Sequence, residues 1–525
     1  MITMRGVTVA AILTLVALTT IPALAQGADE PVMGFMVQAQ FGPDTGQSPG
    51  TLFEATTADG RFVVGAGFCD VWNTRFRTDR DVVQFFARPT SGEREFTMER
   101  LPRPLAEHGA YMYDFGGEVI AATDGASSRV SAWDPATSSW DRRETTAPLR
   151  MRLGDGVLAF GSSRVWYDDE SVLAPPEQGS TGSFYYAGGR LCFYHIWRGA
   201  VEGYQPWESD DVGFSKLIAC PWTPGEGPVD LSRAIVLTLP YVGETTFAWG
   251  QFDGKPLTVS NLGGVYFLDG GQWRTLRAPE LGVSYQVYTM VRCYDDLMLG
   301  QYPSGELWRF DGETITRLEG WPPVIEGAAT YSREAQTAIV WGGELLVGVW
   351  PWAELWRYSP DAQRWHSMGR MFTQPEVHAD PGHPWEAECT EAGQVINQWG
   401  QRLTSMVPLG DALMASTSAK WPVPPDQAPE FIPEEALAEY GSVLRIRVPG
   451  CLSARIHWTR APTQLEFAIT GERMVIRQNG LELGSTAIDA ELAQGIAASG
   501  GLDEVTWGSG VFGPWGGVSV TGEAR

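Results

Sequence analysis

The sequence predicts an all-β protein: a β-propeller, with seven blades favoured over eight, followed by a small C-terminal β-sandwich-like domain. The 525-residue chain contains 61 glycines and 22 tryptophans and has almost no helical periodicity, which indicates many short strands joined by tight turns. A turn followed by a short apolar strand recurs about every 50 residues, the spacing of propeller blades. A small repeated sheet cannot bury both faces alone, so we expect the copies to pack around an axis.

Eight copies of this short strand are apolar on both faces, and we interpret them as the inner strands of blades. They are residues 60–65, 116–122, 154–161, 188–194, 254–260, 295–300, 342–348 and 410–416. Close spacing around Val157 suggests that one copy is not an inner strand, which favours seven blades. We expect the segment GFMVQAQ (34–40) to close the ring by pairing with the last blade near Leu413.

A second strand with an aromatic residue follows most copies and ends in a D-G, D-P or S-P turn. In GELWRFDGETITRLEGW (305–321) we expect the second and third strands of one blade, with Trp308 in the core and Asp311-Gly312 in the turn.

Two units resemble repeats of the kelch family of β-propellers. GGELLVGVWPWAELWRYSPDAQRW (342–365) has the turn, the two strands, a Tyr, a Pro and a Trp seven positions after the Tyr. GGEVIAATDGASSRVSAWDPATSSW (116–140) has Trp133 in the place of the Tyr. A single small residue, Gly348 or Ala122, stands where kelch repeats usually carry a double glycine. The resemblance implies a divergent kelch-like propeller over residues 26–421.

The run WPVPPDQAPEFIPEE (421–435) contains five prolines and is typical of a linker, which we place at 422–435. Residues 436–525 are predicted to form a small β-rich domain, with a hairpin turn at Asn479-Gly480 and one helix over 489–500. This hairpin and the ending VTWGSGVFGPWGGVSVTG (505–522) weakly resemble laminin-G-like or concanavalin-like jelly rolls. The piece is shorter than a complete domain of that kind and lacks an acidic run for calcium.

The N-terminus is typical of a secretory signal peptide over residues 1–25. Arg5 precedes an apolar run, and Ala23-Leu24-Ala25 predicts cleavage before Gln26, so we expect a secreted or periplasmic, and bacterial, protein. No second apolar run has the length of a membrane-spanning helix. The net charge of −25 excludes nucleic acid and anionic membranes as partners, and we expect a monomer.

Catalytic and metal motifs are scarce. The chain has no G-x-S-x-G, no H-E-x-x-H, no P-loop and no Asp-box, so catalytic residues stay unknown and no cofactor is predicted. Six widely spaced cysteines contain no C-x-x-C pair, and buried thiols or one to two disulfides are equally consistent with them. His378 and His383 lie in a loop rich in metal-ligand residue types (376–389), but their spacing matches no regular metal motif.

The predicted ligand-binding residues are the polar and aromatic ones just past the recurring strands, because these should emerge at one mouth of the central channel. Aromatic faces beside amides and charges suit sugars and other small polar ligands. The predicted residues are Asp70, Trp72, Asp124, His195, Trp197, Arg198, Asn261, Gln301, Tyr302, Trp350, Trp352 and Lys420.

Three functions are consistent with these patterns. The first is an exported propeller that binds a glycan or a protein partner at this mouth. The alternative is an extracellular carbohydrate-active enzyme, a glycoside hydrolase or a polysaccharide lyase, with Asp70 and Asp124 as acid and base. A structural or enzyme-accessory role has no distinguishing feature.

Overall fold

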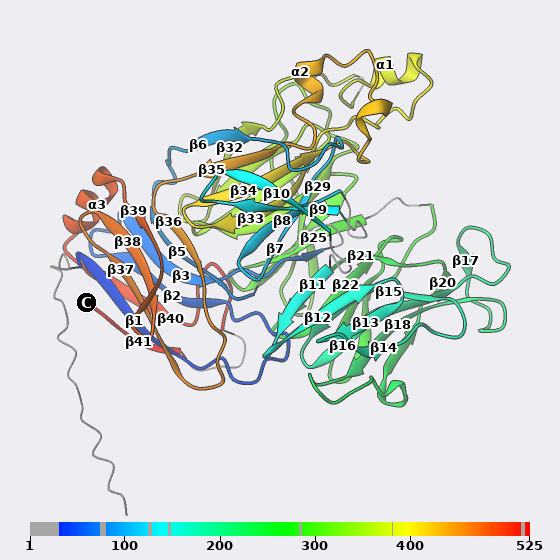
Figure 1. The fold of residues 1–525 in the computed structure, drawn as a ribbon, viewed down its shortest axis with the longest axis horizontal. Helices are drawn as coiled ribbons and strands as arrows, with labels where there is room; N and C mark the ends of the chain where they lie inside the picture. Colours follow the sequence, from blue (N-terminus) through cyan, green and yellow to red (C-terminus); the bar gives the residue numbers. More distant parts are fainter. Residues whose placement is uncertain are drawn as a thin grey trace, which may run out of the picture. The chain divides into compact units, whose positions relative to one another are not determined.

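The structure, a computed structural model, describes residues 31–73, 80–123, 129–144, 149–282, 286–380, 382–515 and 520–525. Strands dominate these residues, which confirms the predicted all-β class (Figure 1). Seven antiparallel sheets, six with four strands and one with five, form the predicted propeller, and four strands of each sheet make up a blade. The proposed signal peptide lies outside the described residues.

The seven blades contain the following strands. Blade 1 comprises β7 (Tyr111–Phe115), β8 (Glu118–Ala122), β9 (Arg129–Asp134) and β10 (Ser139–Glu144). Blade 2 comprises β11 (Leu149–Leu153), β12 (Gly156–Gly161), β13 (Arg164–Tyr167) and β14 (Glu170–Leu173). Blade 3 comprises β15 (Ser180–Ala187), β16 (Arg190–Trp197), β18 (Phe214–Pro221) and β19 (Ile235–Thr238). Blade 4 comprises β21 (Thr246–Phe252), β22 (Lys255–Ser260), β23 (Val265–Asp269) and β24 (Gln272–Arg277).

Blade 5 comprises β25 (Gln286–Cys293), β26 (Asp296–Tyr302), β27 (Leu307–Phe310) and β28 (Ile315–Leu318). Blade 6 comprises β29 (Glu334–Trp341), β30 (Glu344–Trp350), β31 (Glu354–Ser359) and β32 (Arg364–Arg370). Blade 7 comprises β33 (Arg402–Leu409), β34 (Ala412–Ser418), β35 (Val443–Arg447) and β6 (Thr97–Leu101). A short ribbon of β17 (Gln205–Pro206) and β20 (Tyr241–Val242) extends from blade 3, and η1 (Leu231–Arg233) precedes β19.

The recurring apolar strand is the second strand of each blade, so its assignment as the inner strand is wrong. The first strands are innermost, because β21, β25, β29, β33 and β7 contact one another in that order. A second strand has hydrogen-bonded neighbours on both edges and blades on both faces, and all seven residues of β30 are buried. The second strands are therefore apolar on both faces, as an inner strand would also be. By the same shift, the stretch 305–321 contains the third and fourth strands of blade 5.

The ring is closed by β6, which precedes blade 1 and pairs with β35 from Leu101 opposite Val443 to Thr97 opposite Arg447. The expected closure by GFMVQAQ is wrong, because β1 (Met33–Ala39) pairs with β37 and β41 instead. Alternate residues of β1 are fully buried, a pattern that fits a sheet with one covered face better than a blade.

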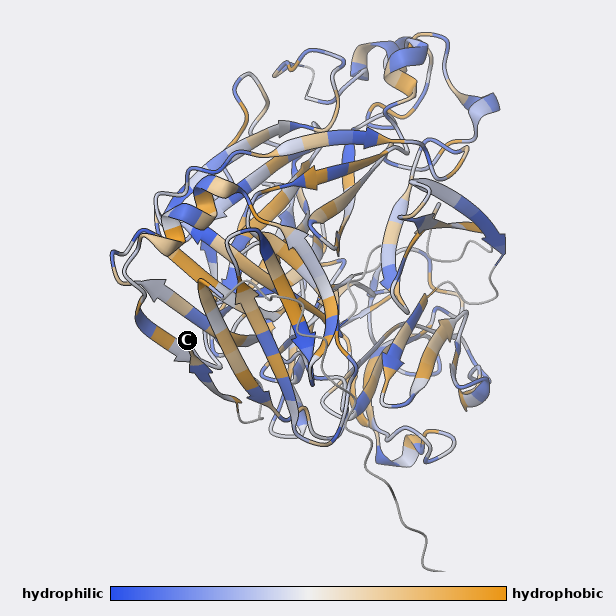
Figure 2. Cartoon of the chain, turned by 60° about the vertical axis from the view of Figure 1, so that its left-hand side comes forward, coloured by the Kyte–Doolittle hydropathy of each residue, from blue (hydrophilic) through white to orange (hydrophobic). Residues whose placement is uncertain are grey.

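A β-sandwich of two five-stranded sheets combines both ends of the chain. One sheet contains β39 (Leu481–Ala487), β38 (Arg473–Gln478), β37 (Thr463–Ile469), β1 and β41 (Val520–Ala524). The other contains β36 (Cys451–Arg455), β5 (Val82–Pro89), β3 (Phe62–Phe68), β2 (Thr51–Thr57) and β40 (Leu502–Trp507). Hydrophobic and hydrophilic residues alternate as coloured bands along the strands in Figure 2, and the ring centres of Phe35 and Phe53 stack 4.1 Å apart in the shared core.

The sheets therefore do not follow the predicted boundaries between propeller, linker and C-terminal domain. The strand around Phe62, counted among the blades, belongs to the sandwich, whereas the strand around Val157 belongs to blade 2. The proline-rich run 422–435 connects β34 and β35 within blade 7 and contains η2 (Pro425–Gln427) and the start of α2 (Glu434–Leu437). Two local predictions are confirmed: the hairpin at Asn479-Gly480 and the helix α3 (Ala490–Ala497).

All six cysteines are buried and free, which decides between the two alternatives in favour of thiols. Among the described residues, no helix combines the length and hydropathy needed to cross a membrane.

Candidate functional site

The loop between β3 and β5 of the sandwich enters the propeller. Its short strand β4 (Trp72–Asn73) pairs with β21 on the edge that faces the axis, and it also contacts β25. The Trp72 indole donates a hydrogen bond to the Phe184 carbonyl oxygen (3.1 Å), and the Asp70 carboxylate accepts one from Gln251 Nε2 (3.2 Å). The two predicted residues of this loop thus fasten it inside the ring.

The C-terminal end of this loop, just before β5, is held by a buried ion pair. Both terminal nitrogens of Arg80 donate to the Asp44 carboxylate at 2.9 Å, and Nη2 also donates to the Arg152 carbonyl oxygen at 2.9 Å. Backbone N–H groups of Gly46 and Gly154 complete the hydrogen bonding of Asp44. This two-pronged, charge-assisted geometry is among the strongest polar contacts in proteins.

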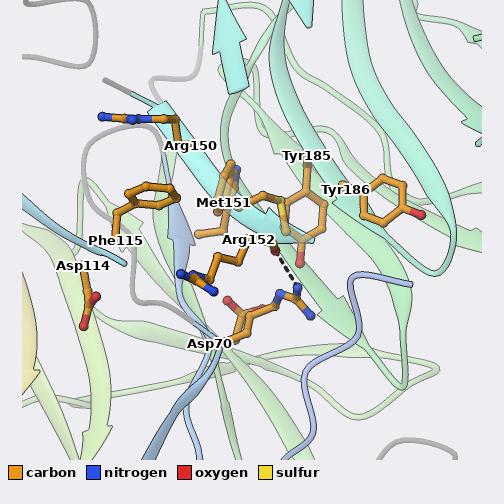
Figure 3. Close-up of a pocket in the computed structure, with 10 residues that line it drawn as sticks. Asp70, Asp114, Phe115, Arg150, Met151, Arg152, Tyr185 and Tyr186 are labelled. Carbon is orange, nitrogen blue, oxygen red and sulfur yellow. Dashed lines mark hydrogen bonds between the residues drawn. The ribbon is translucent and has the colours of Figure 1, made fainter. Parts of the chain in front are cut away.

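A small cavity lies beside Asp70 (Figure 3). Its volume of about 20 Å³ has room for one water molecule and no sugar. Burial, reinforced by the Asp70 charge, raises the pKa of Tyr185 well above its ordinary value. The residues that line the cavity are Asp70, Trp72, Arg80, Asp114, Phe115, Arg150, Met151, Arg152, Tyr185 and Tyr186.

The other predicted residues follow second strands, which all run antiparallel to the first strands, so they lie toward one face of the ring. His195 and Trp197 end β16, Arg198 follows it, and Asn261 follows β22. Gln301 and Tyr302 end β26, Trp350 ends β30, and Trp352 and Lys420 lie just beyond β30 and β34. Asp124 lies outside the described residues.

Several of these side chains form hydrogen bonds with neighbouring residues or are buried. Gln301 Oε1 accepts a hydrogen bond from Ser304 Oγ (2.5 Å), and Lys420 Nζ donates to Asn397 (2.8 Å). Trp350 and Trp352 are buried.

The loop with His378 and His383 covers these two tryptophans. The rings of Trp350 and His383 are 4.9 Å apart, and those of Trp352 and His378 are 5.0 Å apart. His383 Nδ1 also lies 2.6 Å from Glu386 Oε2 at the start of α1 (Glu386–Glu391). Across the described ranges, no three His, Cys, Asp or Glu side chains gather as metal ligands. Sequence reasoning did not connect this loop with the tryptophans, because β31 and β32 separate the two segments along the chain.

Arg198 and Asn261 are brought together by a residue that sequence reasoning missed. The Arg198 guanidinium lies 5.8 Å from the centre of the Tyr204 ring, and Asn261 Nδ2 donates to the Tyr204 hydroxyl (2.8 Å). Asn261 Oδ1 accepts from the Thr245 backbone N–H (2.9 Å), so its amide orientation is set by both contacts. Residues from blades 3 and 4 thus meet around the side chain of Tyr204, which is 40% exposed.

A second exposed aromatic residue, Trp207 (42% exposed), lies in the same loop. Its indole N–H donates to Asp210 (3.2 Å), which pairs with Lys216 (2.5 Å). The hydrogen bond from Lys216 lowers the pKa of Asp210, so this carboxylate is ionised at neutral pH. Lys216 in turn lies 4.4 Å from the ring of Phe214.

These contacts continue to two more predicted residues. The Phe214 ring is 4.8 Å from that of His195 and 6.0 Å from that of Trp197. Arg198 and Asn261 meet at Tyr204, and Trp207 lies three residues farther along the same connection; we call these four residues the blade 3 face. Its signal in the sequence is the long connection 198–213, which holds two aromatic residues but no apolar strand pattern.

No protein-family model and no curated protein matches the chain. Solved structures with a similar arrangement include a puromycin hydrolase, 13% identical with a TM-score of 0.35 over 60% of this chain and 50% of that one. The WD40 repeats of RRP9 match 67% of this chain and 100% of theirs (10% identity, TM-score 0.33). BamB from Moraxella catarrhalis matches over 75% of this chain and 95% of its own (11% identity, TM-score 0.31).

The chain therefore spans about half the length of the puromycin hydrolase it matches. No family model supports the kelch-like and laminin-G-like resemblances, which are not confirmed. The all-β propeller fold is shown by the sheets of the chain itself.

Proposed function

We propose that the protein is an exported binding protein that recognises carbohydrate through the blade 3 face. The observation that supports this most is the meeting of Arg198 and Asn261, from adjacent blades, around the exposed ring of Tyr204. Propeller scaffolds serve many functions, so the proposal depends on this surface and not on the fold.

The chemistry of the face suits a sugar. Tyr204 and Trp207 offer ring faces on which the apolar side of a pyranose packs, at little cost in side-chain entropy. The guanidinium of Arg198 donates to Gly203 O (3.2 Å), which leaves further N–H donors for hydroxyl groups. Aromatic faces with a few fixed polar groups are the usual composition of small-ligand sites.

The enzymatic alternative has less support. Asp70 faces a cavity with room for only one water molecule, and its carboxylate accepts a hydrogen bond from Gln251. A glycosidase acid or base must reach the glycosidic oxygen or its attacking water. The pairing of Asp70 with Asp124 therefore stays a hypothesis from the sequence.

A glycan-array experiment tests the proposal. We expect the purified protein to bind a subset of glycans, and the double variant Tyr204→Ala/Trp207→Ala to bind them at least about tenfold more weakly, equivalent to about 1.4 kcal/mol. Tyr331→Ala, which removes a still more exposed aromatic ring outside the face, serves as the control and should bind normally. Unchanged binding by the double variant would contradict the proposal, and release of reducing ends or unsaturated products would favour an enzyme.

A further inference from the structure

The propeller carries a small helical cap made of residues 380–400 and 420–437, described except for residue 381. Both α1 and α2 lie in it, at one end of the molecule in Figure 1. Its two segments share one core with Trp385, Trp399 and Ile432, and the Tyr440 hydroxyl donates to the Trp399 carbonyl oxygen (2.7 Å). The cap is therefore an ordered part of the structure with a defined outer surface.

An exposed apolar patch lies on this cap. Val395 is 53% exposed, and Ile396 and Trp421 are each 46% exposed. They come from different segments, which are held together because Gln398 Nε2 donates to the Trp421 carbonyl oxygen (3.3 Å) and the Lys420 N–H donates to the Gln398 carbonyl oxygen (3.1 Å). The two hydrogen bonds bring the segment of Val395 and Ile396 beside that of Trp421, and exposed apolar residues on adjoining segments are typical of an interaction site.

The two segments that form the cap are strongly acidic. Lys420 is the sole Lys or Arg in the two segments, against eight carboxylates. None of these carboxylates pairs with Lys or Arg among the ion pairs of the described residues. The carboxylates belong to Asp380, Glu386, Glu388, Glu391, Asp426, Glu430, Glu434 and Glu435.

We propose that the cap is a docking surface for a basic amphipathic segment of a partner protein. Trp421 and Ile396 would pack against the apolar side of the segment, and the carboxylates would attract its Lys and Arg side chains. An apolar centre with a charged rim is the common layout of protein interfaces. An anionic membrane or a nucleic acid is disfavoured, because both would meet uncompensated negative charge.

The test uses the full chain and fluorescently labelled amphipathic peptides. A helical peptide of leucine and lysine should bind, as followed by anisotropy, whereas its leucine and glutamate counterpart should not. We expect Ile396→Ser/Trp421→Ser and, separately, Glu430→Gln/Glu434→Gln to weaken binding about tenfold. The control Glu313→Gln/Glu319→Gln changes the net charge equally at exposed positions outside the cap and should change binding less than twofold.

Three outcomes would overturn the proposal. Equal weakening by the control variant would show attraction to the whole acidic protein, and unchanged binding by the Ile396/Trp421 variant would remove the apolar contact. Co-sedimentation with phosphatidylglycerol vesicles in preference to the peptide would show a lipid surface instead. Unchanged thermal unfolding of each variant verifies that the cap is folded.

Discussion

Replacing Glu344 by glutamine is expected to lower the free energy of unfolding by about 3–5 kcal/mol, because it leaves two buried guanidinium groups without their counter-charge. Glu344 is 1% exposed and accepts hydrogen bonds from Arg94 (2.9 Å) and Arg357 (2.6 Å). Arg94 also donates to the carbonyl oxygens of Gly342 (2.9 Å) and Pro449 (2.6 Å). Arg94 lies where the chain passes from the sandwich to the propeller, and Pro449 lies where it returns to the sandwich. Through Arg94, the Glu344 carboxylate of blade 6 is thus connected to both of these segments.

The shift in denaturation midpoint, followed by tryptophan fluorescence and circular dichroism, measures this effect. Glu118→Gln is the matched control, because it breaks an ion pair with Arg143 whose side chains are 45% and 44% exposed. We expect that control to stay within about 1 kcal/mol of the wild type. Equal destabilisation by the two variants would contradict a special role for Glu344.

Asp44→Asn is the second change with a large expected effect, again about 3–5 kcal/mol, because it breaks the buried pair with Arg80. The same pair anchors the loop that enters the ring, so the variant should also expose this loop to limited proteolysis. Asp141→Asn, at a carboxylate that is 64% exposed, is the control and should change neither measurement. A stable Asp44→Asn variant with an intact loop would contradict this anchoring role.

Acid should abolish the difference between wild type and Asp44→Asn. Burial alone would raise the pKa of Asp44, but the Arg80 charge and the hydrogen bonds from Arg80, Gly154 and Gly46 bring it below its ordinary 3.8. The folded state therefore holds fewer protons here than the unfolded state, and this contribution is complete above 3.8 and lost as pH falls through the lower folded value. A stability difference that persisted unchanged at lower pH would show that Asp44 acts through something other than its charge.

Local information predicted seven blade strands correctly among eight candidates, because each blade carries turn residues and a buried strand of similar composition. The order of the strands from the axis outward could not be predicted from local information. The second strand of a blade is as apolar as the first, so composition does not distinguish the two. Spacing is also a poor guide, because the closely spaced strand around Val157 belongs to blade 2, whereas the strand around Phe62 belongs to the sandwich. Assembly of the sandwich from both chain ends depends on pairings such as Phe35 opposite Phe467, which no local pattern encodes.

The candidate site shows the same division. Arg198 and Asn261 were predicted from their positions after second strands, and the structure places both against Tyr204. Tyr204 and Trp207 were missed because the connection 198–213 was considered only at its first residues. Trp350 and Trp352 match the expected composition of a binding mouth, but loop packing buries them.

A double-mutant cycle on glycan binding tests most directly whether residues of two blades act as one site at the blade 3 face. Isothermal titration would compare the wild type, Arg198→Ala, Asn261→Ala and the double variant, with a glycan identified on the array. We predict a coupling energy above about 0.5 kcal/mol, because both side chains contact Tyr204 and would contact one ligand. Losses that add within about 0.3 kcal/mol, or no loss in either single variant, would contradict a shared carbohydrate site.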